Sequence, residues 1–176
     1  MTIIREATPT DAPGIARVHI DSWRTTYRGL VPDSYLASLR SEDRQRMWER
    51  ALNDPSYRGF LYVAEAEDGN VVGFAAGGPS RSEDVEYEGE LYAIYILEDY
   101  QGKGIGRRLV KVIAERLTSA GIHSMLVWVL TGNPAQRFYE ALGGEELRRQ
   151  QFDLEGMTLD EVSYGWKDIF TILGRV

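Results

Sequence analysis

The stretch Gln101-Gly102-Lys103-Gly104-Ile105-Gly106 joins two segments of different character. The preceding run, residues 91–97, carries no charge and is rich in β-forming residues, which predicts a buried strand. The following segment repeats apolar residues at mostly three- and four-residue spacing and stops at Gly121, which predicts a helix. A strand that turns through glycines into a helix leaves backbone N–H groups without intrahelical partners, and these groups favour a bound anion. The sequence therefore predicts a phosphorylated ligand at this loop.

The residues that the loop lacks narrow the class of ligand. A P-loop requires Ser or Thr after its lysine, but Lys103 is followed by Gly104. A dinucleotide-binding loop requires a third glycine where Arg107 stands and an acid after the next strand, whereas the apolar run 125–130 ends in Thr131-Gly132-Asn133. Nucleotide hydrolase and dehydrogenase functions are therefore disfavoured, and a tight glycine turn without a ligand is the structural alternative.

The pattern Gln-x-x-Gly-x-Gly resembles the pyrophosphate-binding signature of the GNAT superfamily of N-acetyltransferases, which hold acetyl-coenzyme A (acetyl-CoA). Three further segments fit this family in the right order. They are a short N-terminal strand followed by two helices, the run 133–144 with its asparagine and Phe-Tyr pair, and a final hairpin at 145–152 and 158–166 around Gly156. The resemblance covers essentially the whole chain. It implies an α/β fold in a single domain, residues 1–176, with a mixed central β-sheet of about seven strands flanked by helices.

The remaining sequence patterns predict elements in an order that agrees with this fold. We expect a first helix near residues 9–25 and a second helical region from Asp33 to residue 53, broken near Ser41. Strands are predicted at 60–66 and 71–76, and the stretch 77–84 is predicted to be a loop. The order β-α-α-β-β-β-α-β-α-β-β gives a mixed sheet with helices packed on it.

Composition and charge exclude several classes of function. The 176 residues are enough for one buried core and contain no cysteine, so a disulfide framework and a thiol nucleophile are excluded. The two histidines, His19 and His123, are too far apart in sequence to suggest a metal site, and we expect none. The net charge of −7 disfavours nucleic-acid binding. Without a signal peptide or a long apolar run we expect no membrane association and a cytoplasmic location, while the oligomeric state stays open between monomer and homodimer.

The resemblance implies which residues hold acetyl-CoA. The pyrophosphate would lie against the loop and the first residues of the following helix, namely Gln101, Gly102, Lys103, Gly104, Ile105, Gly106 and Arg107. The backbone of the preceding strand, at Ile94, Ile96 and Leu97, would bind the pantetheine arm and orient the acetyl carbonyl. Asn133 belongs to the second cofactor motif.

The resemblance also implies two catalytic residues. Tyr139, six residues after Asn133, matches the family tyrosine that protonates the coenzyme sulfur, and a phenol remains protonated at neutral pH. Packing of Phe138 and Tyr139 in the core is the alternative. Glu90, eleven residues before Gln101, matches the general base of histone-acetylating members. Glu88 would share its face in a regular strand, and a water chain could replace either carboxylate as the base.

Substrate-binding residues are predicted from aromatic and acidic side chains. Trp23 and Tyr27 lie where the first helices of the family form the acceptor wall, and aromatic residues suit an alkylammonium group. Five carboxylates in the run 83–90, Glu88 among them, would attract cations. An ordinary core stripe and a solvated loop are the structural alternatives. The sequence thus predicts transfer of an acetyl group to a small-molecule primary amine in a ternary complex; a protein N-terminal or lysine acetyltransferase and a non-catalytic acyl-CoA-binding module are the alternatives.

Overall fold

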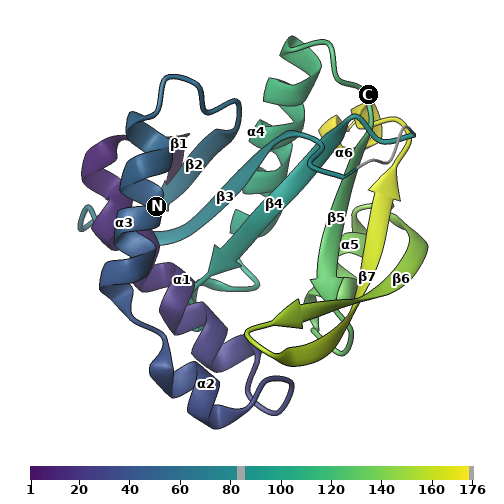
Figure 1. Cartoon of the computed structure of the whole chain (residues 1–176). Coiled ribbons are helices and arrows are strands. Elements are labelled where there is room, and N and C mark those ends of the chain that lie inside the picture. The colour runs from purple at the N-terminus through teal and green to yellow at the C-terminus, as the bar shows by residue number, and fades with distance from the viewer. Residues whose placement is uncertain (83–85, 175–176) are drawn as a thin grey trace.

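The computed structural model describes residues 1–82 and 86–174, in which seven strands form one sheet (Figure 1). The order across the sheet is β1-β2-β3-β4-β5-β7-β6. The strands are β1 (Ile3–Glu6), β2 (Phe60–Glu65), β3 (Val71–Pro79), β4 (Gly89–Ile96), β5 (Met125–Leu130), β6 (Glu145–Leu154) and β7 (Met157–Trp166). The pair β4–β5 is parallel and the other neighbours are antiparallel. The predicted mixed α/β fold is therefore confirmed.

Helices cover both faces of this sheet (Figure 1). They are η1 (Pro9–Asp11), α1 (Ala12–Thr26), α2 (Asp33–Ser38), α3 (Ser41–Asn53), η2 (Glu98–Tyr100), α4 (Ile105–Ser119), α5 (Ala135–Ala141) and α6 (Phe170–Leu173). Helices α4, α5 and α6 pack on one face, and α1 and α3 pack on the other. The expected break near Ser41 is confirmed, because α2 ends at Ser38 and α3 begins at Ser41. None of the helices in the described ranges is long and apolar enough to cross a membrane.

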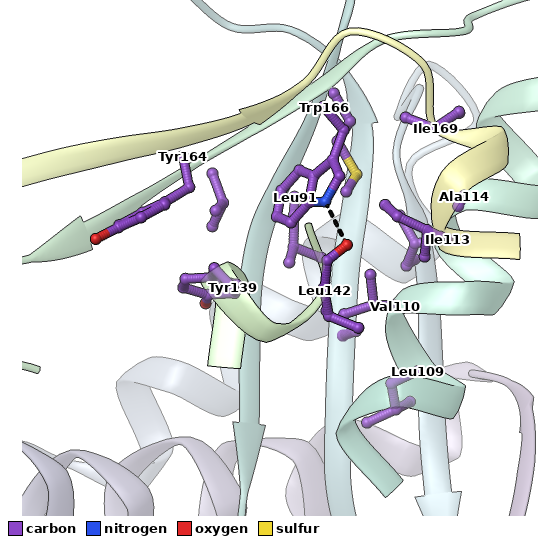
Figure 2. Packing of buried hydrophobic residues seen from close by; sticks show 14 of the residues in the cluster. Leu91, Leu109, Val110, Ile113, Ala114, Tyr139, Leu142, Tyr164, Trp166 and Ile169 are labelled. Carbon is purple, nitrogen blue, oxygen red and sulfur yellow. Dashed lines mark hydrogen bonds between the residues drawn. The ribbon is translucent and has the colours of Figure 1, made fainter. Parts of the chain in front are cut away.

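The larger core lies between α4 and the sheet (Figure 2). The apolar side chains of α4 that set the helical period are all buried: Ile105, Leu109, Val110, Ile113 and Leu117. Each such side chain stabilises the fold by roughly 1.5 to 3 kcal/mol through burial. Trp166 of β7 closes the core and donates a hydrogen bond from Nε1 to the Leu142 carbonyl oxygen, 2.9 Å away. This bond ties the end of α5 to β7.

A β-bulge in β4 changes which side chains face which helices. Ala76 of β3 pairs with Ala93 and Gly77 pairs with Leu91, so Tyr92 is the extra residue. Beyond the bulge, Ile94 and Ile96 contact the α4 side. Ala93 and Tyr95 contact the α1 side. The bulge therefore directs Tyr95 away from the core under α4.

Strands β4 and β5 also diverge. Their described pairing comprises only Gly89, Glu90 and Leu91 of β4 with Met125, Leu126 and Val127 of β5. The arrowheads of the two strands lie well apart in Figure 1. From Tyr92 onward, the edge of β4 that faces β5 has no paired strand among the described residues, so its backbone groups are available to a ligand.

One expectation about the elements is wrong, and one element was not predicted. The predicted loop at 77–84 begins too early, because β3 continues to Pro79 and pairs Gly77 and Gly78 with β4. These glycines suggested a loop, but they are needed for close packing: a Cβ on Gly77 would lie 2.6 Å from Ile113 Cγ2, and one on Gly78 would lie 2.7 Å from the Tyr92 hydroxyl. The short helix α6 was not expected either, and it buries Ile172.

Candidate active site

The loop before α4, residues 101–104, has a backbone conformation that suits a bound anion, and we call it the glycine cradle. Gly102 and Gly104 have φ values of 70° and 76°, a region that favours glycine, and no heavy atom lies within 4 Å of a Cβ built on either residue. The backbone bond from Arg108 N to Gly104 O, at 3.2 Å, opens the helix, so the amides before Arg108 lack an intrahelical acceptor. Open space, free N–H groups and the positive end of α4 together fit a pyrophosphate.

Side chains hold this loop against the end of β4. Gln101 donates a hydrogen bond from Nε2 to the Ile96 carbonyl oxygen at 3.0 Å. The ammonium group of Lys103 lies 5.2 Å from the ring centroid of Tyr100. Arg107 is exposed on the first turn of α4 and Ile105 is buried beneath it. The side chain of Gln101 therefore fixes the loop, and the positively charged side chains of Lys103 and Arg107 lie close to it.

Gly106 fixes the spacing between α4 and α5. A Cβ on Gly106 would lie 3.1 Å from the Phe138 ring and 3.3 Å from Ile96 Cδ1. A larger residue would push α5 away from the loop. This contact joins the predicted pyrophosphate site to the helix that carries Tyr139.

Asn133 lies in the turn just before α5, and Tyr139 lies within the helix. Asn133 is buried, and its Oδ1 accepts a hydrogen bond from the Ala135 amide at 2.9 Å, which orders the first turn of α5. Tyr139 is 4% exposed and packs beside Tyr164 and Trp166 (Figure 2). Burial raises the pKa of Tyr139, and the nearby Tyr95 raises it further. The hydroxyl therefore stays protonated at neutral pH, as a general acid requires.

Glu90 is buried in an ion pair. Its carboxylate accepts hydrogen bonds from the Arg81 amide at 2.9 Å and from Arg81 Nη2 at 2.7 Å. The same guanidinium lies 4.1 Å from the ring centroid of Tyr92. A proton accepted by Glu90 would neutralise the carboxylate and weaken its ion pair with Arg81. Its role as a base stays a prediction.

The acidic run is not brought together as one surface in the described residues. The expectation that Glu88 and Glu90 share a strand face is wrong, because β4 begins at Gly89: Glu88 precedes it and is exposed, while Glu90 is buried. The backbone amide of Glu88 bonds Ser124 Oγ at 3.0 Å. Glu83 and Asp84 lie outside the described residues.

Trp23 and Tyr27 form the end of α1 that faces the diverging strands. Their ring centroids are 4.6 Å apart in an edge-to-face arrangement, and Tyr27 is 6% exposed. The Tyr27 hydroxyl lies 3.2 Å from the hydroxyl of Tyr95 on β4. Residues of α2, β5 and the β6–β7 hairpin pack around this pair. The structure thus places both predicted wall residues next to β4.

Sequence reasoning missed Tyr95. The prediction singled out Ile94, Ile96 and Leu97, which are half-buried, but it ignored the polar tyrosine between the two isoleucines. The alternation of side chains along a strand was the available signal, because it sends Tyr95 to the face opposite Ile94 and Ile96. That face is the one on which Trp23 and Tyr27 lie.

The imidazole ring of His19 packs against the ring of Tyr95. The two rings stack with centroids 5.1 Å apart and planes inclined by 19°. Trp48 donates a hydrogen bond from Nε1 to His19 Nδ1 at 3.3 Å. Burial lowers the pKa of His19 from 6.5 to about 3, and the positive charge of Arg44 contributes to the same shift. His19 is therefore neutral throughout the physiological range.

The buried His19 should make stability depend on pH. The unfolded chain binds a proton at this residue below pH 6.5 while the folded chain does not, so its contribution is complete above pH 6.5 and is lost as pH falls toward 3. Between pH 7 and pH 5 we expect a loss of about 2 kcal/mol in the free energy of unfolding, at about 1.4 kcal/mol per pKa unit. Urea unfolding of His19→Gln should lack this loss. The exposed His123 provides the control, since His123→Gln should keep it; an unchanged pH dependence in His19→Gln would contradict the assignment.

Known proteins are similar to this chain in sequence and in fold. A family model described as the acetyltransferase (GNAT) family matches residues 20–144. The uncharacterized N-acetyltransferase YuaI from Bacillus subtilis (strain 168) is 44% identical over 178 residues, which cover 99% of this chain and 100% of YuaI. The L-methionine sulfoximine/L-methionine sulfone acetyltransferase from Pseudomonas paraeruginosa is 27% identical over 75% of this chain and 73% of its own length.

Solved structures of other proteins have folds similar to that of this chain. The PaiA N-acetyltransferase from Thermoplasma acidophilum, crystallised in complex with coenzyme A, has a TM-score of 0.70 with 19% identity and covers 94% of this chain and 99% of its own. The family model matches most of the chain, and YuaI is similar along its full length. These matches show that this protein is an N-acetyltransferase of the GNAT family.

Proposed function

We propose that this enzyme transfers the acetyl group of acetyl-CoA directly to the primary amine of a small molecule, with both substrates bound together. The proposal rests on how three segments lie relative to one another. The contact between Gly106 and Phe138 joins the glycine cradle to α5, which carries Tyr139. The aromatic end of α1 lies next to β4, through Tyr27 and Tyr95. In this proposal the phosphate site, the proton donor Tyr139 and the wall of Trp23 and Tyr27 surround the point where β4 and β5 diverge.

Each part has a role in this reaction. The loop of Gly102 and Gly104 holds the pyrophosphate, and the free edge of β4 binds the pantetheine arm and polarises the acetyl carbonyl through a backbone N–H group. Tyr139 gives its proton to the departing sulfur. Holding the two reactants in position lowers the barrier by roughly 7 to 11 kcal/mol, so no covalent intermediate on the protein is required. Glu90 serves as the base only at the expense of its ion pair with Arg81.

The acceptor is proposed to be small and amphipathic. Trp23 and Tyr27 lie in a packed cluster with α2 and the β6–β7 hairpin. Such a cluster suits a compact amine better than an extended peptide. The name of the Pseudomonas relative, an acetyltransferase of L-methionine sulfoximine and L-methionine sulfone, supports amino-acid-like acceptors.

A screen of acceptors tests this function. Purified protein is mixed with acetyl-CoA and one amine at a time, namely L-methionine sulfone, other amino acids, polyamines, aminoglycosides and peptides with a free N-terminus or lysine, and the release of thiol is followed. We expect turnover with one or more small amines at least 10-fold above the peptides. Preferred turnover of a peptide would replace the small-molecule proposal by the protein-acetylating one, and tight acetyl-CoA binding without any transfer would favour a non-catalytic binding module.

A further inference from the structure

The segment after β3 carries an arginine that three separate contacts hold in place. Glu90 is buried, and its Oε2 accepts a hydrogen bond from the Arg81 amide at 2.9 Å, while its Oε1 accepts one from Arg81 Nη2 at 2.7 Å. The guanidinium lies over the ring of Tyr92, 4.1 Å from the ring centroid. The backbone and the charged end of Arg81 are therefore both held, although its side chain is 61% exposed.

The ring of Tyr92 is itself fixed beneath the guanidinium. Its hydroxyl donates a hydrogen bond to the Pro79 carbonyl oxygen. Gly78 leaves room for this hydroxyl, since a Cβ at that position would lie 2.7 Å from it and 2.9 Å from Gly59 Cα. An arginine that is stacked on a fixed ring loses little further freedom when it binds a ligand. Arg81 is therefore organised for binding in advance.

One edge of the Arg81 guanidinium remains open. Glu90 accepts hydrogen bonds from Nη2 at 2.7 Å and from Nε at 3.4 Å, so it occupies the edge that these two nitrogens form. The two N–H groups of Nη1 and the second N–H group of Nη2 have no acceptor among residues 1–82 and 86–174. The edge formed by Nη1 and Nη2 has the spacing that matches the two oxygens of a carboxylate.

The position of Arg81 along β4 places this edge near the reactive end of the cofactor. With the pyrophosphate at the loop after β4, the pantetheine arm runs back along the strand towards Tyr92, the first residue of β4 without a partner on β5 among the described residues. Tyr92 and Tyr95 both contact the α1 side of the sheet, where Tyr27 lies. An acceptor held against this side of β4 would come within reach of Arg81.

We propose that the open edge of Arg81 binds a carboxylate of the acceptor, so that the preferred substrates are amino acids or other small amines that carry a carboxylate. This inference rests on the proposed function. Arg81 determines specificity and takes no part in making or breaking bonds, and the buried Glu90 orients it.

Hydrogen-bond geometry provides the recognition in this proposal. The ion pair of Arg81 and Glu90 is neutral as a unit, so selectivity comes from two parallel N–H···O bonds and not from an excess of positive charge. The ammonium groups of a polyamine carry only donors and cannot satisfy this edge, so polyamines should be poor acceptors.

The test pairs each amino acid with its own primary amide. The amide has nearly the same size, but it is uncharged and places an NH₂ donor against the arginine in place of one oxygen. L-Methionine sulfone and L-leucine, each with its amide, are suitable pairs, and the release of thiol gives kcat/KM for every member. We expect the wild type to prefer the amino acid on the order of 10-fold or more, since hydrogen bonds between charged groups are among the strongest.

Arg81→Lys is the variant that tests the contact, because it keeps a positive charge beside Glu90 and replaces the planar fork by one ammonium group. The preference for the amino acid should fall about 10-fold, as expected for one hydrogen bond to a charged group. Both members of a pair are measured on the same preparation, so partial loss of folded protein cancels in their ratio. The different basicity of the two amines cancels when the ratio is compared between wild type and variant.

Arg116→Lys is the matched control. Arg116 is also exposed and lies 4.9 Å from the centroid of an aromatic ring, that of Phe60. It belongs to α4, on the opposite side of the sheet from α1. The preference for the amino acid should therefore be unchanged in this variant.

Calorimetry tests the same contact without turnover. In the dead-end complex with coenzyme A, L-methionine sulfone should bind about 10-fold more weakly to Arg81→Lys than to the wild type, whereas binding of its amide should change little. Acetylation of small amines with an unchanged preference in Arg81→Lys, or a wild type that prefers the amides, would overturn the assignment of Arg81 and leave the proposed function intact. Absence of transfer to every small amine would instead overturn the proposed function, and the calorimetry would then decide on Arg81 by itself.

Discussion

Gly104→Asp is expected to weaken coenzyme A binding at least about 10²-fold. Gly104 is the N-cap of α4, and its Cβ position opens into the space where we place the pyrophosphate. A carboxylate about 4 Å from a phosphate charge opposes binding by roughly 4 kcal/mol at the effective dielectric of a protein surface. Isothermal titration calorimetry with coenzyme A measures the change directly.

Two matched variants separate charge from backbone strain. Gly104→Asn has nearly the same size and tolerates the same positive φ, so it should retain most of the affinity that Asp removes. Gly121→Asp places the same residue at a positive φ of 80° at the other end of α4 and should leave coenzyme A affinity unchanged. Equal loss in Gly104→Asn would assign the effect to shape, and undiminished binding in Gly104→Asp would remove the loop from the cofactor site.

Gly106→Asp would be a poorer test of the same site. Its side chain would collide with Phe138 and Ile96 before it reached a ligand. Lost binding could then reflect a displaced α5 instead of electrostatic repulsion. This difference between Gly104 and Gly106 is visible only in the packed structure.

Tyr139→Phe is expected to lower kcat by about 10²-fold or more while the fold persists. The variant keeps the ring that packs beside Tyr164 and Trp166 and deletes the proton donor alone. Coenzyme A affinity and the unfolding midpoint should therefore remain near the wild-type values. Steady-state kinetics with the best acceptor from the amine screen provides the measurement.

Tyr164→Phe is the matched control for this variant. Tyr164 lies beside Tyr139 (Figure 2). Its hydroxyl donates a hydrogen bond to Glu140 Oε1 at 3.1 Å and accepts one from Gln136 Nε2 at 3.2 Å. We expect kcat to change little in Tyr164→Phe. Wild-type turnover in Tyr139→Phe, or an equal loss in both variants, would assign Tyr139 to packing.

The segments with strong local signals were predicted well. The strand at 125–130 and the helix that begins at Ile105 agree with β5 and α4, because apolar periodicity and glycine stops act within a few residues of sequence. The prediction failed at Gly77 and Gly78, where the glycines serve close packing against Ile113 and Tyr92 instead of a turn. Contacts with residues far away in the sequence determine the conformation of this segment. A local sequence pattern carries no information about such contacts.

The sequence by itself determined the α/β class, the glycine loop before α4 and the tyrosine that follows Asn133, since each is a pattern of adjacent residues. Only the tertiary structure decided how the side chains of the site are paired. It engaged Glu90 with Arg81, separated Glu88 from it, and brought Tyr95 to Tyr27 across 68 positions of sequence. The physical reason is that a bulge in β4 and the divergence of β4 from β5 set which face each side chain meets, and both depend on strand pairing between segments far apart in the chain.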